Sequence, residues 1–393
     1  MLTSLALIFL CGLLLGSILK KMKLPGLIGM LISGIIIGPN GLNLLDGSLL
    51  SLSADLRQIA LVIILTRAGL SLDLEDLKKI GRPAVFMSFI PACFEMLGTI
   101  LIAPKLFNIS LFEAALLGAV IASASPAVIV PRMLKLMETG YGTDKRIPQL
   151  ILAGDSVDDI FNIVVFTSLL GLANGERLSL TRFSVVPLSV LSGIAVGIIS
   201  GLLLSFLFKK INTKALSRVI IILSTAFLSV TLEDKIKTIV PFSGLLAIMT
   251  AGVVIFKKSP DAAKDISAKL SILWVGAEIF LFVLVGASVS IKYAASSGLR
   301  TILLLAAVLL IRAVGILLCL IKTPLNRKEK LFCTLTGIPK ATVQAAIGGI
   351  PLAMGLTCGE TVLSAAVIAI LVTAPLGAFL LDISYRKLLD KNE

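Results

Sequence analysis

Residues 147–162 read Ile147-Pro-Gln-Leu-Ile-Leu-Ala-Gly-Asp-Ser-Val-Asp-Asp-Ile-Phe-Asn162, and they open an apolar run that continues to residue 171. A run of about 20 apolar residues crosses the ~30 Å hydrocarbon core of a bilayer as a helix. This run nevertheless carries three carboxylates, at Asp155, Asp158 and Asp159. It therefore predicts a membrane helix that holds ionisable groups inside the bilayer.

The composition places the chain in a membrane. Of its 393 residues, 57% are apolar and 15% are charged, and the mean hydropathy is +1.05, well above that of a soluble domain. A soluble enzyme is therefore excluded, and the lipid bilayer is the expected partner. The net charge of +13 is explained by Lys and Arg in the loops of a polytopic protein, and does not indicate binding to nucleic acid.

Two residue types limit the chemistry. The sequence contains no histidine, so proton chemistry must use carboxylates or lysines. The cysteines lack the paired spacing of a disulfide framework or a thiolate metal site; they are Cys11, Cys93, Cys319, Cys333 and Cys358. We expect no enzymatic activity and no cofactor.

Apolar runs predict an all-α polytopic membrane protein with about thirteen transmembrane helices. The predicted ranges are 2–19, 24–38, 56–73, 84–103, 111–134, 147–171, 183–208, 215–232, 239–256, 270–290, 299–321, 331–356 and 360–383. One side of the membrane then holds 25 of the 36 Lys and Arg, the other holds 8, and 3 lie at membrane depth. The positive-inside rule places the C-terminus in the cytoplasm and the N-terminus outside the cell membrane.

An inverted repeat is indicated by features that recur about 217 residues later. Glu95 corresponds to Arg312, and the Pro-interrupted stretch 122–131 corresponds to the Pro- and Gly-interrupted stretch 338–351. The offset is seven helices, an odd number, so the second copy would insert upside down, as in many secondary transporters. Within a single transmembrane domain we expect repeats over about 1–171 and 215–383, a linking helix over 183–208, and core helices around 84–171 and 299–383.

The adjacent pair Asp158 and Asp159 is expected near the bilayer midplane, roughly 17 Å from the start of its helix. An ionised carboxylate there costs at least ~2.5 kcal/mol, so such residues mark ion pathways or proton relays. Neighbouring helical positions point about 100° apart, which gives the two aspartates different roles. Asp155 is a possible lining residue of a cytoplasmic funnel or a solvated interfacial carboxylate, and Asn162 a possible uncharged ligand.

Three cationic residues lie at membrane depth: Arg67, Arg312 and Lys340. Arg312 cannot lose its charge, so it requires a carboxylate partner, either Asp158 or Glu95. Lys340 lies in the interrupted helix, where a cation would offset exposed carbonyl dipoles. Arg67 lies near a helix end and is expected to extend toward the interface.

The sequence resembles the monovalent cation/proton antiporter superfamily, and within it the NHA-type sodium/hydrogen exchanger branch. The matching segments are Pro91-Ala-Cys-Phe-Glu95, Ser125-Pro-Ala-Val-Ile-Val-Pro131, Gly140-Tyr-Gly142 leading to Ile147-Pro148, Val157-Asp-Asp-Ile160, Arg312-Ala-Val-Gly315 and Ile338-Pro-Lys-Ala-Thr-Val-Gln-Ala-Ala-Ile-Gly348. They follow one another from residue 91 to residue 348, so the resemblance covers most of the chain.

The resemblance implies that Asp159 binds the transported ion and alternates between cation and proton, with Asp158 beside it. Arg312 takes the position where electrogenic relatives place a lysine, and Glu95 is its implied salt-bridge partner. Ser125 and backbone carbonyls of the crossing helices are implied ligands. The family works as a homodimer whose core moves against a scaffold in an elevator-like cycle.

The expected function is exchange of a monovalent cation, Na+ or Li+, for H+, without net charge because Arg312 cannot release a proton. The alternatives are a K+/H+ antiporter, a channel, or a Na+-coupled solute symporter of related fold. An intramembrane aspartyl protease is disfavoured, because it places its two aspartates on separate helices. Selectivity depends on cavity size and ligand number, which no motif encodes.

Overall fold

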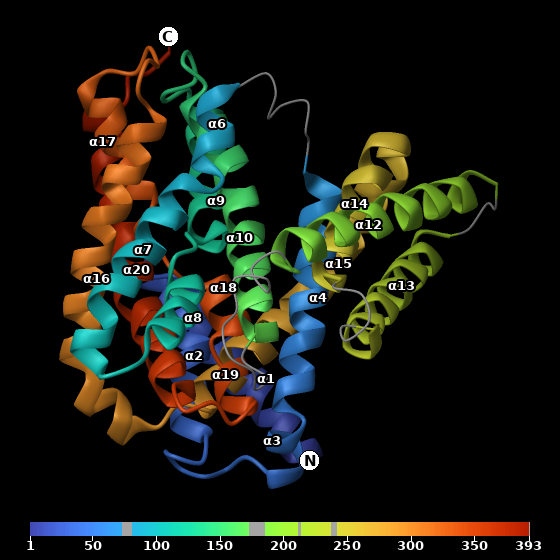
Figure 1. Ribbon diagram of the computed structural model, residues 1–393, viewed down its shortest axis with the longest axis vertical. Helices are drawn as coiled ribbons and strands as arrows, with labels where there is room; N and C mark the ends of the chain where they lie inside the picture. Colours follow the sequence, from blue (N-terminus) through green and yellow to red (C-terminus); the bar gives the residue numbers. More distant parts are fainter. Residues whose placement is uncertain (73–80, 173–184, 211–213, 237–241, 393) are drawn as a thin grey trace. The chain divides into compact units, whose positions relative to one another are not determined.

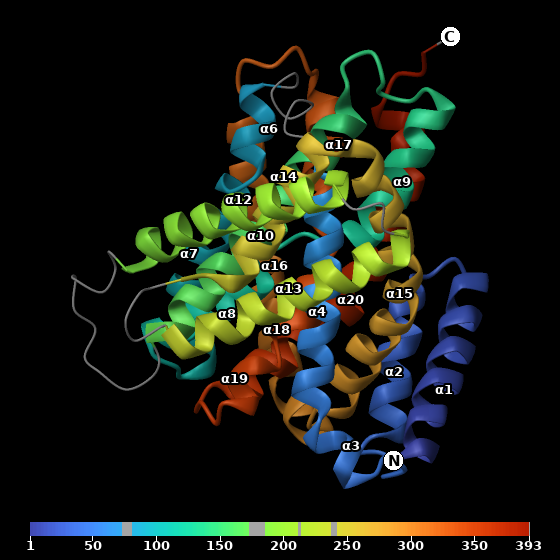
Figure 2. The ribbon, with the colours of Figure 1, turned by 90° about the vertical axis from the view of Figure 1, so that its right-hand side faces the viewer.

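The structure is a computed structural model that describes residues 1–72, 81–172, 185–210, 214–236 and 242–392, and these residues are almost entirely helical (Figures 1 and 2). The chain divides into two compact units. Unit 1 comprises Met1–Ala54, Asp76–Ile163 and Ile279–Glu393, and unit 2 comprises Asp55–Glu75 and Val164–Glu278. Lys78 and Lys79, predicted in a basic loop, and the first residues of the predicted spans 183–208 and 239–256 lie outside the described residues.

Unit 1 holds the N-terminal helices, the helices on either side of two chain interruptions, and the C-terminal helix. Its helices are α1 (Leu2–Lys21), α2 (Gly26–Ile37), α3 (Gly47–Ser51), α6 (Arg82–Met87), α7 (Ile90–Phe107), α8 (Leu111–Ile121), α9 (Pro126–Thr139), most of α10 (Ile147–Leu172), the end of α15 (Pro260–Ala287), α16 (Ile291–Cys319), α17 (Arg327–Thr336), α18 (Thr342–Ile347), α19 (Ile350–Ala353) and α20 (Gly359–Leu388).

Unit 2 is built on close helix packing through small residues. It holds most of α4 (Ser53–Ser71), the end of α10, α12 (Val185–Lys210), α13 (Ala215–Ile236), α14 (Gly244–Lys258) and most of α15. Gly193, Gly197 and Gly201 recur every four residues on α12, and a Cβ on any of them would lie 2.6–2.8 Å from a backbone oxygen of α14. Small residues at this spacing let membrane helices approach closely.

Each of the thirteen predicted ranges contains a helix of the structure. Within the described residues, eight segments are long and apolar enough to cross a membrane; the count of thirteen crossings stays a prediction. One range is divided where the sequence predicted a continuous helix: α6 ends at Met87 and α7 begins at Ile90. Pro91 stands in the first turn of α7, and proline favours such a start because it has no N–H to donate to the preceding turn.

Both predicted helix interruptions are present. The first leaves Ala122–Ser125 between α8 and α9, and the second leaves Gly337–Ala341 between α17 and α18. Pro126 begins α9 at a position that suits proline, while Pro339 lies inside the second gap, where it cannot donate a helical hydrogen bond. The two gaps leave backbone groups that need partners elsewhere.

Helices α7 and α16 lie close together because glycines remove side chains at their contact. A Cβ on Gly98 would lie 2.7 Å from Ile311, and one on Gly315 would lie 3.1 Å from the backbone of Pro91. Glu95 lies one turn before Gly98 on α7, and Arg312 lies next to Ile311 on α16. The close packing therefore brings an acidic and a basic side chain together.

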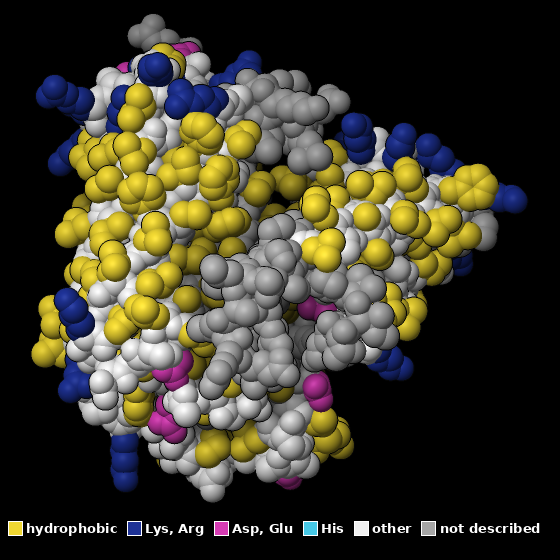
Figure 3. Space-filling view, in the orientation of Figure 1, with side chains coloured by type: hydrophobic (Ala, Val, Ile, Leu, Met, Phe, Trp, Pro, Cys, Tyr) yellow, Lys and Arg dark blue, Asp and Glu magenta, His cyan; other side chains and the backbone are white. Residues whose placement is uncertain are grey.

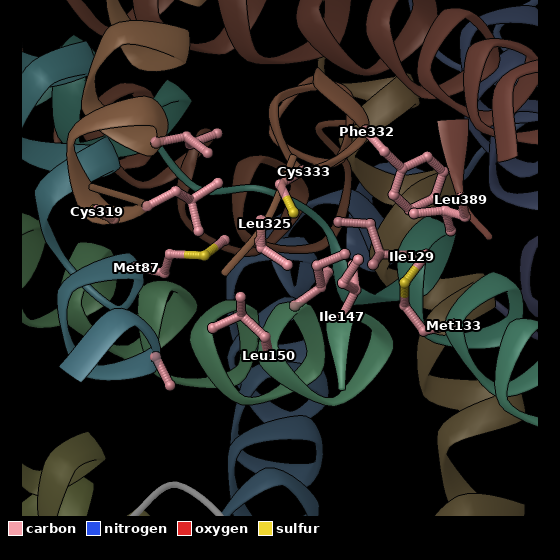
Figure 4. Packing of buried hydrophobic residues seen from close by; sticks show 14 of the residues in the cluster. Met87, Ile129, Met133, Ile147, Leu150, Cys319, Leu325, Phe332, Cys333 and Leu389 are labelled. Atoms are coloured by element: carbon pink, nitrogen blue, oxygen red, sulfur yellow. The ribbon is translucent and has the colours of Figure 1, made fainter. Parts of the chain in front are cut away.

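The end of unit 1 that carries the C-terminus has a continuous apolar core (Figure 4). Ile147 and Leu150, at the start of α10, pack there with Phe332 of α17 and with Leu389, which follows α20. The backbone N–H of Gly142 donates to the backbone carbonyl of Asp390 over 2.8 Å, and the backbone N–H of Asn392 donates to the backbone carbonyl of Gly140 over 2.8 Å. This core fixes the start of α10 eight residues before its first aspartate.

The outer face of unit 1 suits a lipid environment. Leu303, Leu310 and Leu317 are exposed along α16, and apolar side chains cover the middle of this face while Lys and Arg gather toward its ends (Figure 3). Exposed apolar surface of this extent is unusual in a soluble monomer. It agrees with the membrane assignment made from composition.

Candidate ion-binding site

Helix α10 presents Asp158 to a fixed set of donors. The carboxylate is 1% exposed, and its Oδ2 accepts from the Arg312 guanidinium over 2.8 Å and from the backbone N–H of Ala124 over 3.1 Å. A buried ion pair is tolerated when further hydrogen bonds satisfy it. Asp158 is therefore a paired charge within the protein.

A second carboxylate joins the same network. Oε2 of Glu95, a fully buried residue, accepts from Arg312 over 3.1 Å and from the Lys340 ammonium over 2.7 Å. The sequence left Asp158 and Glu95 as competing partners of Arg312; the structure gives Arg312 both. The Lys340 ammonium thus has a carboxylate partner in Glu95, and its interpretation as a cation that offsets exposed helix carbonyls stays a prediction.

Asp159 has a different environment from its neighbour. Its side chain is partly buried, and Oδ1 accepts a hydrogen bond from the Ser123 hydroxyl. Within the described part of the chain it forms no ion pair. The two adjacent aspartates therefore differ, as their directions on the helix predicted: Asp158 is neutralised by Arg312, and Asp159 accepts from a hydroxyl as its one side-chain partner in the described structure.

The first interruption, Ala122–Ser125, supplies much of the site from its backbone. The carbonyl of Ala122 accepts from Arg312, and the carbonyl of Ser123 accepts from the Gln344 amide over 2.9 Å. The N–H of Ala124 donates to Asp158, and the N–H of Ser125 donates to the carbonyl of Pro339 over 2.9 Å. These four backbone groups of the broken helix thus find partners, and Ser125, which ends the break, has an extended backbone conformation.

The structure places Ser125 against the second interrupted helix. Its hydroxyl lies 3.1 Å from that of Thr342, and the residue is fully buried. The hydroxyl that reaches an aspartate belongs to Ser123, two residues earlier. Of these two serines, the family resemblance implied a ligand role for Ser125 and none for Ser123.

Asp155 and Asn162 flank the aspartate pair on α10. The Asn162 amide donates to the backbone carbonyl of Asp158 over 2.7 Å, while its Oδ1 is buried without a partner in the described structure. Asp155 is 9% exposed and makes no ion pair or hydrogen bond among the described residues. Arg67 lies on α4 in unit 2, partly exposed.

Sequence reasoning missed Ser123 and Gln344. Both lie inside the interrupted stretches that drew attention, and both are fully buried. A polar side chain next to a predicted helix break was the available signal, because freed backbone groups require nearby donors and acceptors. Which residue would meet which group depends on the packing of segments about 220 residues apart, and the sequence pattern does not give that.

Several known proteins are similar to this chain in sequence or in fold. Residues 5–383 match the family described as "Sodium/hydrogen exchanger, transmembrane". Sodium/hydrogen exchanger 9B2 from Homo sapiens is 32% identical over 408 residues, covering 98% of this chain and 75% of the relative. Sodium/hydrogen exchanger 9B1 from Homo sapiens is 31% identical over 414 residues, covering 98% and 78%.

The fold also matches a solved transporter. The sodium proton antiporter MjNhaP1 from Methanocaldococcus jannaschii superposes with a TM-score of 0.83 at 20% identity, covering 98% of this chain and 97% of that one. At this identity the likeness shows the fold. With the family match over nearly the whole length, it establishes that the chain is a multi-pass membrane protein of the sodium/hydrogen exchanger family.

Proposed function

We propose that the chain is a secondary antiporter that exchanges a monovalent cation, Na+ or Li+, for H+ across the cell membrane. One observation carries the proposal: Asp158 is neutralised by Arg312, whereas among the described residues Asp159 meets only the Ser123 hydroxyl. A carboxylate at membrane depth without an internal counter-charge needs a cation or a proton. Either can neutralise Asp159, so the two compete for one group.

Exchange follows from that competition. A cation that reaches Asp159 displaces its proton, and a proton that arrives from the other side displaces the cation. The partners of Asp158 and Glu95 stay in place through both steps, because Arg312 and Lys340 already pair with them. The similar proteins named above are sodium/hydrogen exchangers, which supports Na+ as the cation.

The proposed mechanism uses two inverted repeats, over about 1–171 and 215–383. Two contacts support it: Arg312 pairs with Glu95, and Thr342 meets Ser125, and each pair is 217 residues apart. Residues at equivalent positions of two repeats meet each other only where both lie near the axis that relates the repeats. We propose elevator-type alternating access in a homodimer, with the N-terminus outside and the C-terminus in the cytoplasm.

We propose that the exchange is electroneutral. Arg312 pairs with Asp158 at 2.8 Å and cannot release a proton when the cation arrives. Lys340 is a lysine that could release one, but its ammonium pairs with Glu95 at 2.7 Å. One proton then leaves Asp159 for each cation that binds.

The test uses purified protein in proteoliposomes with an internal pH-sensitive dye. Adding Na+ or Li+ outside is expected to move protons in wild-type vesicles, and a potential clamped with valinomycin and K+ is expected to leave the initial rate unchanged. Dye response to K+ alone would indicate a K+/H+ antiporter. No cation-driven proton flux under any gradient would overturn antiport and favour a symporter.

A further inference from the structure

Asp155 is a buried carboxyl group that the proposed exchange does not use. Its side chain is 9% exposed, and its Oδ2 is buried without a hydrogen-bond partner in the described structure. Asp158 and Asp159, one turn further along α10, both have partners. Burying a carboxyl group without a partner inside a membrane protein costs free energy. Ionisable residues in this position therefore mark functional sites.

Helical geometry places Asp155 on the face that carries the pair. At about 100° per residue, Asp155 points roughly 60° from Asp158 and roughly 40° from Asp159, between the two. Asn162 lies on the same face, about 40° from Asp158. The charged groups that act on Asp155 are Asp158 and Asp159 of α10, Arg312 of α16, and Lys340 before α18.

Within the described part of the chain, the charges around Asp155 leave it without a counter-ion. Arg312 and Lys340 give two positive charges, and Glu95 and Asp158, to which they are bonded, give two negative charges. The network is therefore neutral without Asp155. A buried carboxylate with no counter-ion takes up a proton, and the resulting acid keeps an oxygen that can accept and a hydroxyl that can donate.

We propose that Asp155 is a ligand of the transported cation that binds it as a neutral carboxylic acid, and that it keeps its proton throughout the exchange cycle. The inference rests on the proposed function. In the described structure no three His, Cys, Asp or Glu side chains are grouped as a metal site, so the ligands assigned here are the Asp159 carboxylate with uncharged oxygens. Oδ1 of Asn162, which is buried without a partner in the described residues, is the second such oxygen on this face.

The proposal makes opposite demands on two substitutions. Asp155→Asn keeps a carbonyl oxygen and a donor, as in the neutral acid, so the KM for Na+ should stay within about two-fold of wild type. Asp155→Leu removes the oxygen at similar volume, so KM should rise about ten-fold, equivalent to about 1.4 kcal/mol of binding. Exchange by both variants should remain insensitive to membrane potential.

The experiment measures proton flux against Na+ concentration in proteoliposomes for both variants, together with thermal unfolding. Asp155→Val is the smaller replacement if the leucine variant does not fold. Equal KM values for wild type, the asparagine variant and the apolar variant would show that Asp155 is no ligand. A KM raised as much by asparagine as by the apolar residue, or a changed stoichiometry in the asparagine variant, would show that Asp155 acts as a charge. Absence of exchange in wild type would refute the proposed function instead.

Discussion

The two interrupted helices look alike in sequence but contribute differently to the site. The first break, Ala122–Ser125, contributes mainly its backbone, whose freed groups bind Arg312, Asp158, Gln344 and Pro339. The second break, Gly337–Ala341, contributes the Lys340 side chain, and Gln344 follows it on α18.

The comparison shows that an interrupted helix can either supply backbone groups to an ion site or position a buried side chain. The first break faces the carboxylates of α10, so its backbone dipoles become part of the ion site. The second break is held from behind by α20, where the hydroxyl of Thr373 accepts from the N–H of Lys340 over 2.9 Å. We therefore expect damage at the first break to affect ion exchange and damage at the second to affect stability.

The largest expected effect is on the carboxylate that faces the first break. Cation and proton replace each other at the Asp159 carboxylate. Asp159→Asn removes the negative charge of that group, so exchange should be abolished. Dye-reported proton flux in proteoliposomes measures this. The control is Asp382→Asn, which removes an exposed partner of Arg132 and should leave exchange intact; full activity in the Asp159 variant would rule out its role as carrier.

The next effect concerns the buried ion network that both breaks adjoin. Glu95→Gln leaves the Lys340 ammonium and Arg312 with one carboxylate fewer, and we expect a loss of about 3–5 kcal/mol of stability with part of the transport retained. Thermal unfolding in detergent measures the first, and dye-reported flux measures the second. Asp382→Asn, at an exposed ion pair, should cost less than about 1 kcal/mol. Equal stability of the two variants would contradict the buried network.

A smaller effect tests the support behind the second break. A Cβ on Gly377 of α20 would lie 2.5 Å from the ring of Pro339, so Gly377→Ala should destabilise the protein by about 1–3 kcal/mol through overpacking. Gly298→Ala on α16 is the matched control, because no atom lies within 4 Å of its Cβ. The control should be neutral or stabilising by up to about 1 kcal/mol. The measurement compares the unfolding temperatures of the Gly377→Ala and Gly298→Ala variants. Equal unfolding temperatures would show that the ring of Pro339 can move away from the added methyl group.

The smallest effect joins the two breaks directly. The hydroxyls of Ser125 and Thr342 lie 3.1 Å apart, and a buried hydrogen bond of this kind contributes about 1 kcal/mol. Ser125→Ala and Thr342→Val, measured singly and together in a double-mutant cycle, should show a coupling of that size. Additive effects on unfolding would show that the contact contributes nothing.

Several parts of this structure followed from the sequence alone. Apolar runs predicted the helices, and proline and glycine predicted both breaks, because these signals are local. The pairing of Arg312 was narrowed to Glu95 and Asp158, because a permanent charge at membrane depth demands a carboxylate. Its simultaneous contact with both depends on the approach of α7, α10 and α16, which no local pattern fixes.

The roles of Ser123, Gln344 and Lys340 could not be predicted for the same reason. Ser123 and Ser125 lie two residues apart in the first break, and the sequence pattern does not distinguish the surroundings of the two side chains. The position of α10 determines that the Ser123 hydroxyl contacts Asp159, while the Ser125 hydroxyl contacts Thr342. Lys340 was predicted as an intramembrane cation and is fully buried in the structure, but its partner lies 245 residues away in the sequence.

The most direct test of the central claim is proton release when a cation binds to the purified protein in weakly buffered detergent. If cation and proton compete for Asp159, each bound Na+ releases about one proton, and Asp159→Asn abolishes the release. Binding of Na+ without proton release, or the same release from wild type and Asp159→Asn, would contradict the claim.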